Sequence, residues 1–267
     1  MQSSYVLISN LQLGLSALLI LVNLVLSFAL KLNLGKQLWI ASVRMVVQLL
    51  LVGYILEWVF SLQNPIWVIV LALLMTGLAS QSSVARTNRR FSQIYLNSFI
   101  AILAGSFLLT SLVVGGIIQV SPWYSPQYLI PLLGMILGNS LTGVSLALDR
   151  FMTDLVDQRD RVETLLALGA TGWEAAHGLI NTALRVGMIP TINSMMVMGI
   201  VSLPGMMTGQ ILAGASPQDA VRYQIVIVFA IAAGTAISTL CIILLAFRIL
   251  FNQQDQLQLD RLRKISS

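Results

Sequence analysis

Long stretches without a charged side chain constrain this sequence more than any other feature. Residues 1–30, 58–85, 91–148, 186–218 and 223–247 contain no Asp, Glu, Lys or Arg. Each stretch is longer than the ~20 apolar residues with which a helix crosses a bilayer. Only 9% of the 267 residues are charged, whereas about a quarter are charged in a soluble domain. We therefore expect an all-α polytopic membrane protein, which excludes a secreted domain, a disordered chain and a nucleic-acid binder.

Hydropathy and turn residues divide the chain into seven expected membrane spans. These spans lie at about residues 8–30, 38–60, 65–85, 94–118, 127–148, 180–203 and 220–247. The run before Lys31 is longer than the apolar core of a signal peptide and nothing basic precedes it, so we interpret it as a span. We expect residues 1–250 to form one transmembrane domain and residues 251–267 to form a polar tail.

The basic residues set the expected orientation. Fourteen of the fifteen Lys and Arg side chains lie in loops on one side or within a few turns of it, and only Arg222 lies on the other. Because loops rich in Lys and Arg stay in the cytoplasm, we expect the N-terminus outside and the C-terminus inside. The net charge of +5 therefore reflects topology in a multi-pass protein of the cell (inner) membrane. The single cysteine, Cys241, allows no internal disulfide.

The largest soluble segment is expected at residues 149–179, between the fifth and sixth spans. This segment contains six of the ten acidic residues. Two capping boxes are expected in it, Asp160 with Glu163 and Thr171 with Glu174. Gly169 lies between them and is expected to end the first helix, so the pattern predicts a stiff helix–turn–helix. Its lone histidine, His177, has no partner at metal-ligand spacing and is expected in a solvated loop.

Three leucines in this segment, Leu165, Leu166 and Leu168, are expected to be exposed. A short capped helix with such leucines suits a groove on a soluble partner. A helix lying flat on the membrane would present the same leucines. Glu163 followed six residues later by Gly169 resembles the cytoplasmic EAA-type loop through which ABC transporter permeases contact their ATPase.

Six further segments carry a more specific resemblance. They are residues 51–54 (LVGY), 131–139 (PLLGMILGN), 165–171 (LLALGAT), 188–191 (MIPT), 201–209 (VSLPGMMTG) and 222–225 (RYQI). These segments resemble the FetB iron-export permease family, which includes plant permeases of aluminium tolerance. The resemblance covers about residues 38–248, and the chain is identified as a member of this family.

The resemblance implies a permease subunit of an ABC transporter that exports a metal, with iron as the first expectation. It implies a homodimer with two copies of a separate ATPase subunit, which would bind ATP and Mg²⁺, while this chain would bind no cofactor. The ATPase contact would be formed by Asp160, Glu163, Leu165, Leu166, Leu168, Gly169, Ala170, Thr171 and Glu174. Export of an anionic substrate such as a sugar nucleotide is the alternative with the same architecture.

The sequence supports a separate ATPase on its own. The phosphate-binding pattern G-x-x-x-x-G-K-[ST] is absent, since Gly35-Lys36 is preceded by Leu30 where the first glycine is required and followed by Gln37 where Ser or Thr is required. We therefore expect no catalytic residues in this chain, which would not itself be an enzyme.

Polar or irregular positions within the spans are candidates for a translocation path or gate, because polar groups are costly in lipid. These are Arg44, Gln48, Glu57, Asn139, Arg185, Asn193, Ser202, Pro204, Met206 and Met207. Arg44 and Arg185 are expected near the cytoplasmic interface, and side chains that snorkel to this interface would also explain their positions. If they face a cavity instead, they would favour an anionic substrate. Glu57 is the only carboxylate within a span, so the sequence does not reveal the several oxygen ligands that iron or aluminium prefers.

The sixth span and the segment after it are irregular and rich in methionine. Six of the eleven methionines fall within residues 188–207. Thioethers suit Cu(I) better than iron, although methionine is also an adaptable packing residue, which is the interpretation we favour. Pro190 is expected to kink the helix and Pro204-Gly205 to break it. Residues 206–214 are too short to cross and form either a re-entrant gate or a plain outer loop.

Three further hypotheses concern single positions or other classes of protein. Gly134 and Gly138 predict a face for close helix packing. An intramembrane hydrolase with Ser140 as nucleophile would need a nearby base, but the only histidine lies in the cytoplasmic segment. A secondary transporter would be expected to show inverted repeats and intramembrane acid or histidine relays, which this sequence lacks.

Overall fold

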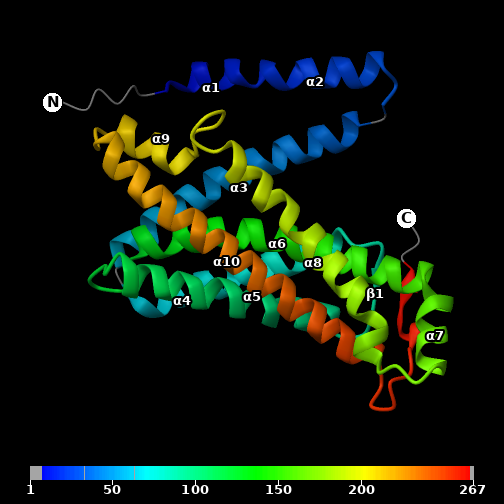
Figure 1. Cartoon of the computed structure of the whole chain (residues 1–267). Helices are drawn as coiled ribbons and strands as arrows, with labels where there is room; N and C mark the ends of the chain where they lie inside the picture. The colour runs from blue at the N-terminus through cyan, green and yellow to red at the C-terminus, as the bar shows by residue number, and fades with distance from the viewer. Residues whose placement is uncertain (1–7, 33, 63, 265–267) are drawn as a thin grey trace. The chain divides into compact units, whose positions relative to one another are not determined.

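The computed structural model describes residues 8–32, 34–62 and 64–264, and most of these residues are helical (Figure 1). Their contacts divide the chain into two compact units. One unit ends at Asn64 and also includes Leu212–Gly214, and the other comprises Pro65–Ile211 and Ala215–Ser267. Among the described helices, six are long and apolar enough to cross a membrane. The expectation of an all-α polytopic membrane protein is confirmed.

The first unit contains α1 (Asn10–Ser16), α2 (Leu18–Ala29) and α3 (Gly35–Leu62). Ser9 and Gln12 form a capping box that starts α1, and Ala17 between α1 and α2 keeps a helical conformation. The two helices therefore together occupy the first expected span. The turn into α3 is closed by Ser27, whose hydroxyl accepts a hydrogen bond from the Leu34 amide at 3.1 Å.

The second unit contains five long helices, which form a bundle (Figure 1). They are α4 (Pro65–Ala85), α5 (Ile94–Ser111), α6 (Pro126–Asp157), α8 (Gly172–Val197) and α10 (Pro217–Leu250). Helix α10 packs on α5, α6 and α8, while α6 also packs on α4, α5 and α8. Helices α6 and α10 therefore form the centre of the bundle, and α8 covers them on one side.

Glycines outside the predicted packing face bring the helices of the bundle together. Gly143 of α6 faces Gly187 of α8: a Cβ at Gly143 would lie 3.0 Å from the Gly187 carbonyl oxygen. Gly105 of α5 similarly faces the backbone of α10 at Gly234. A Cβ at Gly138, in contrast, would meet no described atom within 4 Å. The closest contacts between helix backbones are therefore at these glycines and not at Gly134 and Gly138. The points at which helices cross depend on the residues of the partner helices as well.

Several helix boundaries differ from the expected spans. Helix α6 continues nine residues past 148 because Phe151 and Leu155 are fully buried there, so the start of the expected loop is helical. The span expected at 180–203 overlaps α8, which contains Pro190 and ends at Val197. The chain turns there because Met198 is extended and Gly199 has a φ of 87°. Helix α8 is not among the six apolar helices, so the number of spans stays a prediction.

The remaining elements are short. Helix α5 continues into a π-helical turn, η1 (Leu112–Ile117), and α7 (Arg159–Ala167) and α9 (Gly205–Leu212) precede α8 and α10. The tail contains η2 (Leu259–Arg261) and β2 (Arg263–Lys264), which pairs antiparallel with β1 (Arg89–Arg90). The tail is therefore folded back onto the loop between α4 and α5.

Candidate functional site

The helix–turn–helix predicted near residue 169 is present as the α7–α8 hairpin. Helix α7 ends in a glycine turn, in which the Gly169 amide donates to the Leu166 carbonyl and the Ala170 amide donates to the Leu165 carbonyl, both at 3.0 Å. Gly169 has a φ of 93°, a conformation that other residues rarely adopt. These paired bonds are the usual way of satisfying the last carbonyls of a helix. Helix α7 therefore ends where the sequence predicts.

The second predicted capping box starts α8 and is confirmed. The Thr171 hydroxyl accepts a hydrogen bond from the Glu174 amide at 3.3 Å, and the Glu174 carboxylate accepts from the Thr171 amide at 2.8 Å. The carboxylate also accepts from the Thr171 hydroxyl at 2.8 Å. The hydrogen bond from the Thr171 backbone amide is the largest cause that lowers the pKa of Glu174 below its usual value, and the bond from the Thr171 hydroxyl is the next largest.

The first predicted capping box is wrong. Only Gln158 separates α7 from α6, so α7 begins at Arg159 and Asp160 lies inside its first turn. Glu163 instead accepts a hydrogen bond from Arg159 Nε at 2.7 Å, which raises the pKa of the Arg159 guanidinium. The box fails because the buried end of α6 carries the helical conformation almost to Asp160.

The hairpin exposes fewer apolar side chains than predicted, and its histidine lies in a helix. Leu168 is 80% exposed at the turn, but Leu165 and Leu166 are half-buried. His177 lies in α8 and not in a loop, and its Nε2 is 3.0 Å from the Asn181 side-chain amide. Leu168 is therefore the apolar side chain that the turn presents to a partner.

The start of α8 is attached to the tail and to the end of α10. The Gly172 amide donates a 2.8 Å hydrogen bond to the Asp255 carboxylate, a negative group at the positive end of a helix. A Cβ at Gly172 would lie 2.9 Å from the Phe251 ring. The Trp173 and Phe247 rings meet edge to face with centroids 5.6 Å apart. Asp255 was not predicted from the sequence, because no local pattern connects residues 83 positions apart.

A small cavity lies near the other end of α8. Its volume is about 200 Å³, and it is lined by residues of α6, α8, α9 and α10 and of the segment before α9. The lining residues are Met135, Asn139, Thr191, Ser194, Met195, Met198, Pro204, Gly205, Met206, Gln224, Val228 and Ile231. Four thioethers and four hydrogen-bonding side chains therefore surround a space that holds a small ion or several water molecules.

Gln224 is the polar group of this cavity that most requires a ligand. Its side chain is 6% exposed, and its Oε1 atom has no hydrogen-bond partner among the residues that the structure describes. A buried acceptor without a partner costs about 1–3 kcal/mol. Asn139, in comparison, already uses its amide group to donate to the Met135 carbonyl at 2.9 Å. The unpaired Gln224 oxygen is therefore available to a bound group.

The cavity contains three of the predicted path residues, Asn139, Pro204 and Met206. The others do not line it. Arg44, Gln48 and Glu57 belong to α3 of the first unit, and Met207 belongs to α9. Arg185 and Asn193 are exposed on α8, and Ser202 is exposed in the segment after α8. Thr191, Ser194 and Gln224 were missed, although Gln224 is a polar residue in a charge-free run. In the described chain, no group of three or more His, Cys, Asp or Glu side chains is placed to hold a metal ion.

Ser140 does not resemble an activated nucleophile. Its side chain is completely buried in α6, and its hydroxyl has no hydrogen-bond partner within the described residues. His177, the only histidine, bonds to Asn181. Among the described residues, no base therefore forms a hydrogen bond with this serine.

The same two helices connect the hairpin to the cavity. Thr191 follows Gly172 by 19 residues of α8, a rise of about 29 Å. In α10, Gln224 lines the cavity and Phe247 packs on Trp173 at the hairpin. A helix of this length is comparable to the ~30 Å thickness of the hydrocarbon core. The hairpin and the cavity are therefore at opposite ends of α8 and α10.

These features define a multi-pass helical membrane protein with a capped hairpin at one end and a polar cavity at the other. Residues 10–251 match the family described as "Uncharacterised protein family (UPF0014)". The chain belongs to this family.

Its relatives carry more informative names. The chain is 42% identical to a UPF0014 membrane protein of Synechocystis, covering 85% of this chain and 87% of that protein. It is 32% identical to the "Probable iron export permease protein FetB" of Escherichia coli, covering 96% and 98%. It is 31% identical to "Protein ALUMINUM SENSITIVE 3" of Arabidopsis thaliana, covering 90% and 86%. The family resemblance is thereby confirmed and supports a permease role, while no solved structure matches the chain.

Proposed function

We propose that this chain is the permease subunit of an ABC transporter and that a separate ATPase subunit binds the α7–α8 hairpin. One observation carries the proposal: α8 runs without interruption from the hairpin at Gly172 to the cavity at Thr191 and Ser194. A displacement of the hairpin would therefore move the cavity wall. The name of the Escherichia coli relative, a probable iron export permease, supports the same role.

The hairpin has the properties that such a contact requires. The hydrogen bonds of the Gly169 turn and the Thr171 cap hold the hairpin in one conformation. Binding of a partner therefore costs little conformational entropy in the hairpin. Leu168 offers an exposed apolar anchor. Closure of the ATPases on ATP would push the hairpin, and the bond between Gly172 and Asp255 would transmit the movement to the tail. Two copies of each subunit would complete the transporter.

We propose iron as the exported substrate because of the relative's name. The cavity favours a second candidate, a soft monovalent metal such as Cu(I), since its thioethers outnumber its amide oxygens and no carboxylate lines it. A sugar nucleotide fits the cavity poorly, because sites for ligands of drug size occupy about 300–1,000 Å³. Flux of each metal into inside-out vesicles would distinguish the two candidates.

The ATPase contact is tested by co-purification with a candidate ABC-type ATPase subunit. Leu168→Asp is expected to abolish co-elution and the stimulation of ATPase activity, because it places a charge at the apolar anchor. Leu203→Asp is the matched control, since Leu203 is also exposed but follows the other end of α8. Equal co-elution of both variants with the ATPase would refute the proposed docking site.

A further inference from the structure

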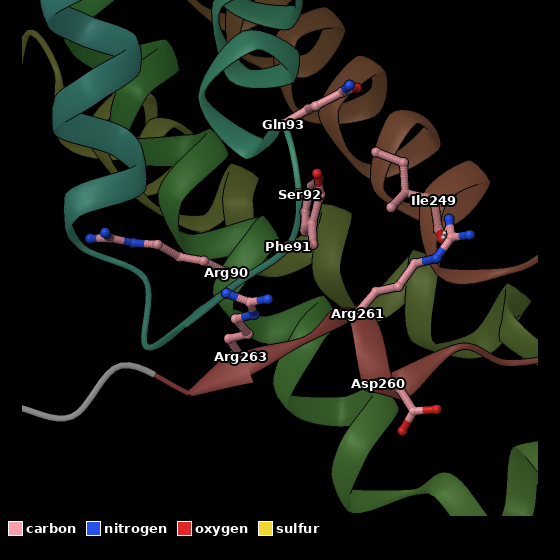
Figure 2. Close-up of a pocket in the computed structure, with 8 residues that line it drawn as sticks. All are labelled: Arg90, Phe91, Ser92, Gln93, Ile249, Asp260, Arg261 and Arg263. Atoms are coloured by element: carbon pink, nitrogen blue, oxygen red, sulfur yellow. Dashed lines mark hydrogen bonds between the residues drawn. The ribbon is translucent and has the colours of Figure 1, made fainter.

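A basic pocket lies where the tail meets the loop between α4 and α5. Its volume is about 670 Å³, and its lining includes Arg90, Ser92, Gln93, Asp260, Arg261 and Arg263 (Figure 2). None of these residues belongs to the hairpin or to the cavity near Gln224. Three arginines and one aspartate line this pocket, so its lining residues carry a net positive charge.

The strand pairing at this pocket opposes like charges. The antiparallel register places Arg90 opposite Arg263 and Arg89 opposite Lys264. Side chains that are directly opposite lie on the same face of the ladder, about 4.5–5.5 Å apart at Cβ, and like charges there are destabilising. Each strand of this ladder has only two residues, so few hydrogen bonds offset that repulsion. The tail would therefore be held more firmly if an anion lay between the arginines.

Within the part of the chain that the structure describes, no carboxylate pairs with these arginines. Among the described residues, Arg90, Arg261 and Arg263 form no ion pair. Arg261 donates to the Ile249 carbonyl at 3.1 Å, and the Arg90 guanidinium lies over the Tyr95 ring at 5.5 Å. The Nε atom of Arg90 is buried without a hydrogen-bond partner in the described chain. In Figure 2 the Asp260 carboxylate points away from the Arg261 guanidinium.

The pocket also lies at the ends of membrane-crossing helices. It opens beside the start of α5 and the end of α10, both of which are apolar enough to cross a bilayer. Gln93 precedes α5 without a side-chain cap, so the positive end of that helix adds to the field of the arginines. The positive-inside rule predicts that this end faces the cytoplasm, where the leaflet carries anionic lipids.

We propose that this pocket binds a phosphate group, supplied by the headgroup of an anionic lipid or by a free phosphate. Guanidinium groups form paired, charge-assisted hydrogen bonds with phosphate oxygens. The phosphate would lie between Arg90 and Arg263 and remove their repulsion. Because the same tail carries Asp255, which bonds to the start of α8, occupancy of the pocket also stabilises the α7–α8 hairpin.

The test uses the full chain purified in a neutral detergent at constant ionic strength. Thermal unfolding is followed while phosphatidylglycerol, phosphatidylcholine or inorganic phosphate is added. The variants are Arg263→Gln, whose side chain is exposed and can be replaced without disturbing the core, and Arg90→Gln combined with Arg263→Gln. Arg86→Gln is the matched control, because Arg86 is an exposed arginine at the end of α4 that does not line the pocket.

Phosphatidylglycerol is expected to raise the unfolding temperature of the unaltered chain and of R86Q in a saturable way. The half-saturating concentration should rise about tenfold or more in R263Q, the change that one charge-assisted hydrogen bond supplies. Protection by phosphatidylglycerol alone assigns the site to a lipid, and equal protection by inorganic phosphate assigns it to a free anion. Equal responses of the unaltered chain and R263Q to both would overturn the proposal, whether or not the double variant folds.

Discussion

Replacing Gly143 with alanine tests the packing at the centre of the bundle. A Cβ at this position would lie 2.6 Å from Thr235 Cγ2, 3.0 Å from the Gly187 carbonyl oxygen and 3.1 Å from Thr239 Cγ2. Ordinary carbon contacts are about 3.5–4.0 Å. Helices α8 and α10 would therefore have to separate from α6 by up to about 1 Å. Such overpacking costs about 1–3 kcal/mol, and contacts on two sides favour the upper end.

The matched control is Gly138→Ala, five residues earlier in the same helix. No described atom lies within 4 Å of a Cβ at Gly138, so alanine there acts only through helix propensity. Alanine is about 0.8–1.0 kcal/mol more favourable than glycine inside a helix. The same gain reduces the net loss in Gly143→Ala to about 2 kcal/mol. The two variants should therefore differ by about 3 kcal/mol in the free energy of unfolding.

Unfolding of both variants in detergent, induced by heat and by SDS and followed by tryptophan fluorescence, measures this difference. Thr235→Ser removes the Cγ2 atom that the new methyl group meets most closely, so it should recover part of the loss in Gly143→Ala. Equal stability of Gly143→Ala and Gly138→Ala would refute the packing described for α6, α8 and α10.

The remaining predictions concern the hairpin and the cavity. Thr171→Ala should raise hydrogen exchange at the start of α8, since loss of a threonine cap costs about 0.5–2 kcal/mol. Because its folded pKa is lowered, Glu174 stabilises the hairpin above its unfolded pKa. This contribution should be lost as the pH falls through the lowered value, which hydrogen exchange at decreasing pH would detect. Asp255→Ala should make the tail more sensitive to proteolysis. Asp255→Asn keeps an acceptor for the Gly172 amide, so its tail should be cleaved more slowly than that of Asp255→Ala. Gln224→Leu should leave the unfolding temperature unchanged or higher but reduce metal flux, and undiminished flux would remove Gln224 from the path.

Local signals account for the parts of the hairpin that were predicted correctly. The glycine turn at Gly169 and the cap formed by Thr171 and Glu174 involve residues at most five positions apart. The Asp160 box failed for a reason outside its own window, since α6 continues past 148 on the buried side chains of Phe151 and Leu155. A capping pattern predicts a helix start only where the preceding helix has already ended.

The residues of the cavity were predicted only in part, because segments far apart in the chain form it. Asn139, Met206 and Gln224 come from α6, α9 and α10. Polarity within an apolar run marks Asn139 and Gln224 as unusual, and the methionine-rich, irregular segment marks Met206, but neither signal says which of these residues meet. Arg44 and Glu57 carried the same signal, but they belong to α3 and are not among the residues that line this cavity.

The sequence by itself determined that the chain is a polytopic helical membrane protein of this family, and where its turn at Gly169 lies. Hydropathy over some 20 residues and hydrogen bonds within one helical turn are local properties, and a sequence displays them directly. Only the tertiary structure decided that Gly143 and Gly187 meet and that Asp255 bonds to α8. Tertiary pairing likewise placed Arg90 opposite Arg263. These contacts depend on the packing of whole helices and on the path of the tail, which no pattern of neighbouring residues records.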